Sequence, residues 1–387
     1  MKILAVETSC DETAVAIIER KERGRNFSIL TNLVFSQIPI HKKFGGVVPG
    51  LAKRAHQEKL LPLLRQALKE TSLLEKRKSF PKIEFDEIKK EFQKDLDFLE
   101  KIERFVKKYS PPCLDLLAVT VGPGLEPCLW QGINFVRFLS LCWNIEAIGV
   151  NHIEAHILAN LIEHPEIEKK PKDFFPAICL VVSGGHTTLF LMEKIGKYKI
   201  LGETRDDAAG ECFDKVAKIL GFSYPGGPII EKRARKVKEK KHHISLPRPM
   251  IHSKDYDFSF SGLKTAVLYH VQAQPSKIRN SSSYKNEMAK EVQEAIIEVL
   301  LFKTEKAIKE YKAKSVIFGG GVVANKTLRE KFSNRLKKKF PNVFLIFPPF
   351  YLCGDNAVMI GISGYFAKKQ KRKLPLEANA NLSLKDS

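Results

Sequence analysis

Two histidines one helical turn apart are the side chains in this sequence best placed to hold a metal ion. His152 and His156 follow the apolar run that ends at Val150 and continue into an apolar segment. Residues four apart lie on one face of an α-helix, so both imidazoles can reach a single ion. Two imidazoles leave such an ion short of a ligand, and a carboxylate is the natural third. Asp355 is the candidate, because it stands in a short loop between an expected strand and an expected helix.

The position of the glutamate between the two histidines distinguishes this pattern from that of the zinc peptidases. In the HExxH motif of those enzymes the catalytic glutamate directly follows the first histidine. Here Glu154 lies two residues from each histidine, and we expect its side chain on the opposite side of the helix. The spacing therefore argues against a metallopeptidase.

A polar segment at residues 204–227 could form a second part of a site. Asp206 and Asp207 can cap a helix that Gly221 would terminate. One face of this helix would be either solvated or part of a site, and the sequence leaves both readings open. That face carries Asp207, Glu211, Asp214 and Lys218.

Glycine-rich junctions follow this helix and recur later in the chain. The bend at residues 225–228 lets backbone approach a ligand closely, because glycine has no side chain. Residues 315–329 combine a strand, three glycines and a helix, a junction that can accept a nucleoside or an anion. Its spacing is not the GxGxxG fingerprint of dinucleotide-binding proteins.

The elements that would position these side chains repeat one design. Residues 3–18 and residues 178–191 each consist of two apolar, β-branched runs around a tight turn rich in hydroxyls or glycine. Each reads as a β-hairpin whose turn exposes backbone N–H groups to a phosphate. We therefore expect a duplicated, two-lobed α/β fold with phosphate held between the lobes. The expected lobes are residues 1–150 and 151–387, with the chain end packing back on the first.

Hydrophobic periodicity and the turn-forming residues between periodic segments predict most of the remaining elements. Residues 114–121, 147–150, 315–321 and 343–347 read as strands, each followed by a helical segment, which is typical of an α/β fold. The sequence also predicts a helix at 49–70 and a surface loop at 275–285. Residues 75–108 contain eleven basic and nine acidic residues, yet their apolar residues keep helical spacing, which predicts one long amphipathic helix.

The net charge of +21 favours a polyanionic partner, of which nucleic acid is the commonest. The alternative is a lysine-rich organism whose proteins are all basic. The basic runs at 232–241, 329–339 and 368–373 contain little aromatic interleaving, so they suggest contacts to a nucleic-acid backbone more than base stacking.

Composition limits the broad class of protein. A length of 387 residues allows about two domains, and a hydrophobic content of 44% fits a globular protein. No apolar run approaches the length of a membrane span, and Met1 and Lys2 lead straight into a strand, so we expect neither an anchor nor a signal peptide. Seven scattered cysteines suggest reduced thiols and a cytoplasmic location.

Eight motifs, in order along nearly the whole chain, resemble the bacterial type of tRNA N(6)-adenosine threonylcarbamoyltransferase, the TsaD family. They are VETSCDET, HKKFGGVVPGLAKRAH, NHIEAH, LVVSGGHTTL, DDAAGECFDKVAKILGFSYPGGP, DFSFSGLKTA, GGGVVANKTLR and CGDNAVMIG. The resemblance implies an actin/Hsp70-like (ribonuclease H-like) fold. It also implies transfer of the threonylcarbamoyl group from threonylcarbamoyl-adenylate to N(6) of the adenosine beside the anticodon, in tRNAs that read codons beginning with A, with release of AMP.

The resemblance also implies roles for individual residues. The metal ligands would be His152, His156 and Asp355, with Fe²⁺ expected and Zn²⁺ compatible with the same ligands. The amine proton would be accepted by Asp11 or Glu12 in the first turn. The adenylate contacts would be Val181, Val182, Ser183, Gly184, Gly185, Asp214, Gly227, Glu231 and Asn325. Many family members have Asp where this chain has Glu231, which would bind ribose hydroxyls.

The expected partners are tRNA, a shorter paralogue of the same fold and a small P-loop ATPase. Two further functions compete with this reading. An actin-like kinase or ATPase would share the fold, but its second phosphate turn would carry an acidic residue for Mg²⁺ chemistry, and residues 183–187 have none. A non-catalytic RNA-binding subunit would explain the charge but not a complete set of metal ligands.

Overall fold

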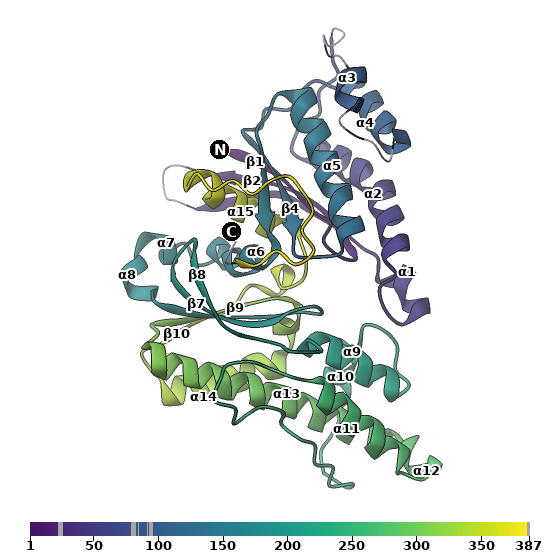
Figure 1. Cartoon of the computed structure of the whole chain (residues 1–387), viewed down its shortest axis with the longest axis vertical. Coiled ribbons are helices and arrows are strands. Elements are labelled where there is room, and N and C mark those ends of the chain that lie inside the picture. The colour runs from purple at the N-terminus through teal and green to yellow at the C-terminus, as the bar shows by residue number, and fades with distance from the viewer. Residues whose placement is uncertain (22–25, 79–82, 84, 91, 93–95, 385–387) are drawn as a thin grey trace. The chain divides into compact units, whose positions relative to one another are not determined.

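The computed structural model describes residues 1–21, 26–78, 83, 85–90, 92 and 96–384 (Figure 1). The chain forms two compact units. Unit 1 comprises Met1–Ile40, Val47–Lys169 and Asp355–Ser387, and unit 2 comprises His41–Gly46 and Lys170–Gly354. Each unit is built around one five-stranded sheet.

The sheet of unit 1 has the strand order β3-β2-β1-β4-β5. Its strands are β1 (Lys2–Glu7), β2 (Glu12–Arg20), β3 (Phe27–Ser36), β4 (Leu116–Gly122) and β5 (Ala147–Asn151). The first three strands are antiparallel neighbours, whereas β4 lies parallel to both β1 and β5. The hairpin expected at residues 3–18 is thus confirmed as β1 and β2.

The sheet of unit 2 repeats this arrangement. Its order is β10-β9-β6-β7-β8, formed by β6 (Ala177–Val182), β7 (Thr187–Lys194), β8 (Lys197–Glu203), β9 (Ser315–Gly319) and β10 (Phe344–Ile346). Strands β6 to β8 are antiparallel neighbours, and β9 lies parallel to β6 and β10. Order and direction match those of the first sheet, so the expected duplicated, actin-like α/β fold is confirmed.

Helices cover both faces of the first sheet. Leu4 and Val6 of β1 pack towards α2 and α5, while Ala5 between them faces α15, as the alternation of side chains along a strand requires. The helices of this unit are α2 (Pro49–Glu70), α3 (Phe85–Lys90), α4 (Leu96–Lys108), α5 (Glu126–Trp143), α6 (His152–Leu158), η2 (Ala159–Ile162), α7 (Glu166–Lys169) and α15 (Ala357–Lys369). The short α1 (Ile38–His41) leads from unit 1 into unit 2.

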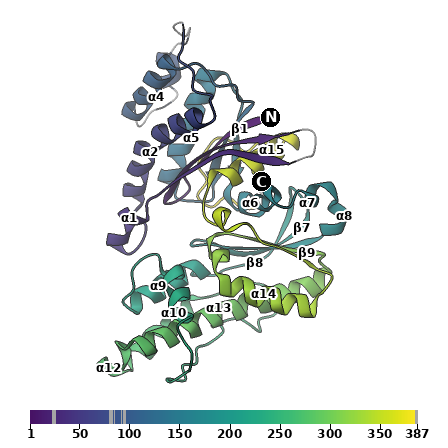
Figure 2. The same cartoon turned by 180° about the vertical axis from the view of Figure 1, so that it is seen from behind.

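In unit 2 the long helix α13 runs along one face of the sheet, where it shares a core with β6 (Figure 2). The helices here are η1 (Lys42–Phe44), α8 (Pro171–Phe174), α9 (Ala209–Ile219), α10 (Gly226–Ala234), α11 (Ser261–Gln272), α12 (Ser276–Arg279), α13 (Ser282–Tyr311), η3 (Gly321–Ala324), α14 (Lys326–Lys339) and η4 (Phe350–Leu352). Among the described residues, no helix is both long and apolar enough to span a bilayer.

The prediction of one long helix at 75–108 was wrong. The described residues contain two helices, α3 and α4, and Phe92 between them is not helical. The reason is non-local: Lys76 and Tyr109 form an antiparallel bridge, so the two ends of the segment lie side by side. A single straight helix cannot return its ends to one another.

The prediction of a loop at 275–285 was also wrong. Residues 276–279 form α12, and α13 begins at Ser282. Ser281 starts α13 because its hydroxyl accepts a hydrogen bond from the backbone N–H of Tyr284. The serine-rich composition therefore marks a helix N-terminus and not a long loop.

Candidate active site

His152 and His156 lie on helix α6, which starts directly after strand β5. Asn151 caps this helix, since its side-chain oxygen accepts hydrogen bonds from the backbone N–H groups of Ile153 and Glu154, at 2.9 and 3.2 Å. The cap fixes the first turn, and with it His152. Both histidines are buried, and their rings are 4.7 Å apart, edge to face.

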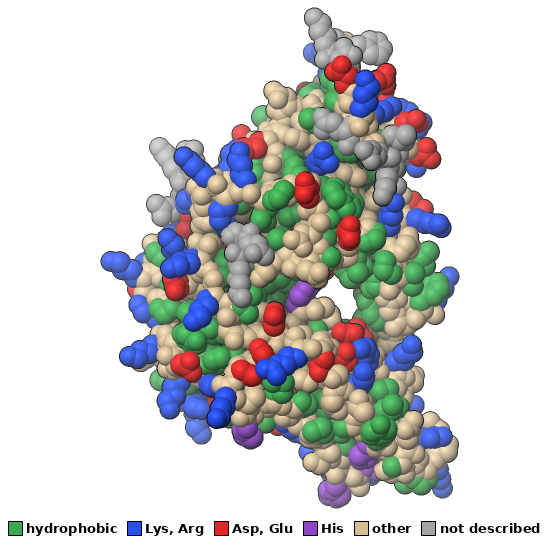
Figure 3. Space-filling view, in the orientation of Figure 1, with side chains coloured by type: hydrophobic (Ala, Val, Ile, Leu, Met, Phe, Trp, Pro, Cys, Tyr) green, Lys and Arg blue, Asp and Glu red, His purple; other side chains and the backbone are tan. Residues whose placement is uncertain are grey.

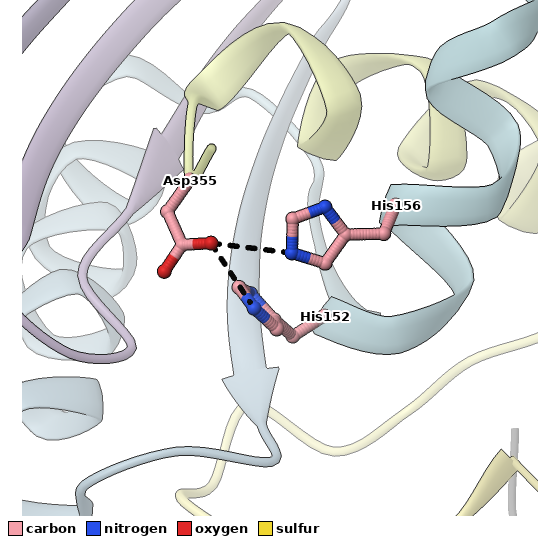
Figure 4. A group of neighbouring side chains, drawn as sticks. All are labelled: His152, His156 and Asp355. Atoms are coloured by element: carbon pink, nitrogen blue, oxygen red, sulfur yellow. Dashed lines mark ion pairs between the residues drawn. The ribbon is translucent and has the colours of Figure 1, made fainter. Parts of the chain in front are cut away.

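Asp355 completes a three-residue group within unit 1 (Figure 4). Its Oδ1 lies 3.5 Å from Nε2 of His152 and 3.2 Å from Nε2 of His156. One ligand atom from each residue lies within 4.8 Å of the others, so the group could hold a metal ion. It stands just before α15, whose first turn Asn356 caps through the N–H of Met359.

Glu7 orients the first histidine, a role that was not predicted from the sequence. Its Oε2 is 3.0 Å from Nδ1 of His152 and accepts a hydrogen bond from the hydroxyl of Thr120 at 2.6 Å. The carboxylate also accepts the backbone N–H of Ser9. Since Nδ1 is occupied by a carboxylate, Nε2 is the nitrogen left to bind an ion. The available signal was an acidic residue at the end of an otherwise apolar strand.

The electrostatics of the group favour a cation. Burial alone would lower the pKa of His152, but the carboxylates of Asp355 and Glu7 outweigh it and raise the pKa to about 9. Burial lowers the pKa of His156, and neither of its ring nitrogens makes a hydrogen bond of normal geometry within the described structure. A neutral, buried imidazole without a hydrogen-bond partner is suited to a metal, so these residues fit a divalent ion.

Glu154 points away from this group, as expected. Its carboxylate binds Arg372, with distances of 2.8 and 3.1 Å to the two terminal nitrogens, and accepts the hydroxyl of Ser363 at 3.3 Å. This residue anchors the back of α6 to the C-terminal segment. It is not available as the general base of a peptidase.

Asp11 lies in the turn between β1 and β2, and Glu12 is the first residue of β2. Asp11 is buried, and its carbonyl accepts the N–H of Gln37 at 2.9 Å. Glu12 is paired with Ser36 across the β2–β3 ladder and accepts its hydroxyl at 3.3 Å. Burial, Asp355 and Asp11 together raise the pKa of Glu12 well above its usual value, so this carboxylate holds a proton more tightly than an exposed one does.

In unit 2, the turn between β6 and β7 presents open backbone. The N–H of Ser183 donates to the carbonyl of His186 at 2.8 Å, which closes the turn. No atom lies within 4 Å of where a Cβ on Gly184 or Gly185 would stand, whereas Val181 and Val182 are fully buried. Neither valine therefore presents its side chain or its backbone to solvent, and the backbone of Val182 lies directly against Gly320.

Asp214 supports the glycine bend that opens α10. Its Oδ1 accepts the N–H of Gly226 at 2.6 Å, and a Cβ on Gly227 would have no neighbour within 4 Å. The helix expected after 204 is confirmed as α9, and Gly221 follows its end with a positive φ of 74°. The predicted cap was wrong, because α9 follows Ala208 without a side-chain cap. The carboxylate of Asp206 instead accepts the backbone N–H groups of Phe260 and Ser261 at the start of α11.

Glu231 and Asn325 connect α10 to the start of α14. Oε1 of Glu231 accepts the N–H of Lys326 at 3.0 Å and lies 3.1 Å from the guanidinium of Arg235. Asn325 caps α14 through the N–H of Leu328 at 2.9 Å, and its amide donates to Gln293 at 2.8 Å. Asn325 follows the carboxyl end of β9, at the edge where parallel α/β sheets bind ligands.

The repeated sheet order and the polar turn that opens each repeat define an actin-like α/β protein. Within that class the chain belongs to the TsaD family. The family model, described as tRNA N6-adenosine threonylcarbamoyltransferase, matches residues 28–77 and 100–362. Residues 78–99, which include α3, lie outside the matched ranges.

Full-length relatives carry the same description. The protein of Thermosipho africanus is 42% identical over 386 residues, which cover 99% of this chain and all of the relative. That of Bacillus cereus strain ZK is 41% identical over 99% of this chain and 96% of its own. Solved structures of similar shape include component A of (R)-2-hydroxyglutaryl-CoA dehydratase from Acidaminococcus fermentans, with a TM-score of 0.48, 10% identity and coverage of 95% of this chain and 99% of that one. The ROK hexokinase of Thermus thermophilus has a TM-score of 0.45 at 12% identity, covering 96% of this chain and all of its own.

Proposed function

We propose that this chain transfers a threonylcarbamoyl group from threonylcarbamoyl-adenylate to N(6) of the adenosine 3′ of the anticodon, in tRNAs reading codons that begin with A, and releases AMP. The observation that carries this proposal is the buried His152–His156–Asp355 group in a chain of the TsaD family. An acyl-adenylate is already activated, so the task that remains is to orient a carbamoyl carbon against a weak amine.

His152, His156 and Asp355 would hold one divalent ion, with Fe²⁺ proposed and Zn²⁺ compatible with the same ligands. When bound, such an ion would stabilise negative charge on the carbonyl or the departing phosphate. Glu7 holds the His152 ring in the orientation that presents Nε2. The ligands come from one helix and one loop of a single unit, so the unit itself fixes their geometry.

The adenylate would bind in unit 2 at the edge formed by the carboxyl ends of β6 and β9. Residues 181–185 and Gly227 would contact its phosphate and adenosine, and within this set Gly184, Gly185 and Gly227 are open to close approach. Asp214 would keep the Gly226–Gly227 bend in place. Glu231 would bind ribose hydroxyls, and Asn325 would complete the nucleoside contacts.

Asp11 or Glu12 would accept the proton that leaves the adenosine amine. The raised pKa of Glu12 supports this role, since a carboxylate that binds its proton more tightly is a better base at neutral pH. Asp11, the preceding residue, is its alternative.

The reaction would take place in the cytoplasm and would need further subunits: a shorter paralogue of the same fold and a small P-loop ATPase. The test combines the purified chain, alone and with these subunits, with threonylcarbamoyl-adenylate and unmodified tRNA, followed by mass spectrometry of the nucleosides. We expect threonylcarbamoyladenosine and AMP in equal amounts. Donor consumption without modified adenosine in every combination would contradict the proposal.

A further inference from the structure

Basic side chains are spread over the molecular face shown in Figure 3, interspersed with acidic ones, so net charge alone does not locate an RNA-binding surface. The structure separates the basic residues that are neutralised by their own chain from those that are not. Only the second kind can displace counterions from RNA without first losing an internal partner.

The basic run at 329–339 is largely neutralised. Arg329 donates to the carbonyls of Val323 and Pro348 at 2.7 and 2.6 Å. Arg335 and Lys339 both bind Glu305. In this run Lys337 and Lys338 remain exposed without an acidic partner among the described residues.

The run at 232–241 behaves differently. Arg235 pairs with Glu231, and Lys240 lies 3.6 Å from Glu291. In contrast, Lys232, Lys236 and Lys238 are exposed and have no acidic partner in the part of the chain that the structure describes. Three positive charges thus remain uncompensated along one short stretch.

A half-buried aromatic ring adds two more cations to this stretch. The guanidinium of Arg233 lies 4.8 Å from the centre of the Phe222 ring, and Nζ of Lys285 lies 5.7 Å from it. The ring holds both cations near α10 without neutralising them. We call Lys232, Arg233, Lys236, Lys238 and Lys285 the α10 basic surface.

The segment that follows α10 is fixed to α13. The buried carboxylate of Glu287 accepts the backbone N–H groups of Lys241, His242 and Ile244 at 2.8, 2.9 and 3.2 Å. These bonds engage the carboxylate of Glu287, which forms no ion pair with Lys232, Lys236 or Lys238 in the described structure. They also set the direction in which residues 236–240 leave the helix.

The α10 basic surface is continuous with the edge proposed to hold the adenylate. Gly226 and Gly227 open helix α10, and Lys232 follows Gly227 by five residues, about 8 Å along the helix axis. A tRNA that brings its adenosine to the donor must place the neighbouring phosphates near that bend. We infer that the α10 basic surface binds the phosphate backbone of the tRNA beside the modified adenosine; this inference rests on the proposed function.

The test is the change Lys232→Ala, Lys236→Ala and Lys238→Ala, made together in the full chain. Binding of fluorescent tRNA is measured by anisotropy at several salt concentrations. Removing three contacts at about 0.7 each should lower the log–log salt slope by about 2 and weaken binding about 100-fold at 0.1 M salt, equally for all tRNAs. The same positions changed to Arg should restore both values.

The matched control removes the same charge elsewhere on unit 2. Lys309, Lys337 and Lys338 are exposed and have no acidic partner among the described residues. Changing these three to Ala should leave the slope near that of the wild type. If the control variant shows a reduced salt slope of tRNA binding and the α10 triple variant keeps the slope of the wild type, the RNA-binding surface lies elsewhere and the inference is overturned.

Two further measurements separate the possible failures. Product formation by the unmodified chain with its proposed subunits tests the function; if product forms while the α10 triple binds tRNA normally, only the surface is wrong. Binding to vesicles of 70% phosphatidylcholine and 30% phosphatidylserine tests a membrane instead. Loss of vesicle binding by the triple, with tRNA binding intact, would also overturn the inference.

Discussion

Nδ1 of His152 lies 3.0 Å from the carboxylate of Glu7, a residue 145 positions earlier in the chain. Strand β1 and helix α6 are thereby joined behind the metal group, and the histidine has only Nε2 left to face Asp355. This contact makes Glu7 a positioning residue for a ligand.

Glu7→Gln should therefore weaken metal binding without unfolding the protein. Carboxylate partners of metal-bound histidines typically contribute 10- to 100-fold in affinity, and we expect a loss of about that size. Titration of the metal-free protein with Co²⁺, followed by absorption, measures the affinity and the ligand geometry together. Glu19→Gln on the neighbouring strand β2 is the control. Equal Co²⁺ affinity in both variants would show that Glu7 does not orient His152.

His156→Ala should remove the ion and abolish transfer while the fold remains. The ring of His156 makes no hydrogen bond of normal geometry within the described structure, so its removal costs the contact with Asp355 and the packing of one buried ring. Elemental analysis gives the metal content, and circular dichroism gives the fold. His164→Ala, a partly exposed histidine of the same unit, should retain its metal. Full occupancy and normal transfer in H156A would remove this residue from the ligand set.

Asp214→Ala should weaken binding of the adenylate much more than binding of tRNA. The change leaves the N–H of Gly226 without its acceptor and frees the glycine bend, at a cost of about 1–3 kcal/mol, or roughly 10- to 100-fold in affinity. Asp214→Asn keeps an acceptor oxygen and should lose less. Calorimetry with a non-reactive adenylate analogue measures both. Unchanged affinity in D214A would indicate that this helix face is merely solvated.

Glu154→Ala should affect stability and not chemistry. Its carboxylate is buried and holds Arg372, so removing it leaves a poorly solvated guanidinium and should cost about 3–5 kcal/mol. Denaturant unfolding of the single variants and of the double variant with Arg372→Ala gives the coupling between the two. The metal content should stay normal. A stable E154A variant that has lost a peptide-cleaving activity would revive the peptidase reading.

Phe98→Ala should destabilise unit 1, although residue 98 lies outside the ranges matched by the family model. The Phe98 ring stacks on Phe135 of α5, with centroids 6.0 Å apart, and is buried in the same core. Loss of a buried phenylalanine costs about 3–5 kcal/mol. The midpoint of thermal unfolding reports the change, with Asp97→Ala on the exposed side of α4 as the control. Equal midpoints would show that α4 is not part of the core.

The sequence predicted what local patterns determine. Alternating apolar runs located β1 and β2, and the spacing of His152 and His156 placed both on one face of a helix. The similarity of the two hairpins predicted that each would belong to one of two matching sheets. These features depend on residues close together in the chain, so periodicity is enough to find them.

Most of the errors depend on contacts between distant residues. Asp206 was expected to cap the helix beside it, but its carboxylate binds backbone 54 and 55 positions away. Glu7 was missed because its partners, Thr120 and His152, come from other elements. No local pattern distinguishes a buried, fully bonded acid from the polar end of a strand.

The bridge between Lys76 and Tyr109 makes neighbours of two residues 33 positions apart. Because α2 ends before this point and β4 begins after it, the chain between them can change length without shifting either element. The free-energy cost of closing this loop grows slowly with its length, while Phe92 and Phe98 within it add buried rings to the core. The length of this segment is thus decoupled from the geometry of the His–His–Asp group, and residues 78–99 within it lie outside the ranges that the family model matches.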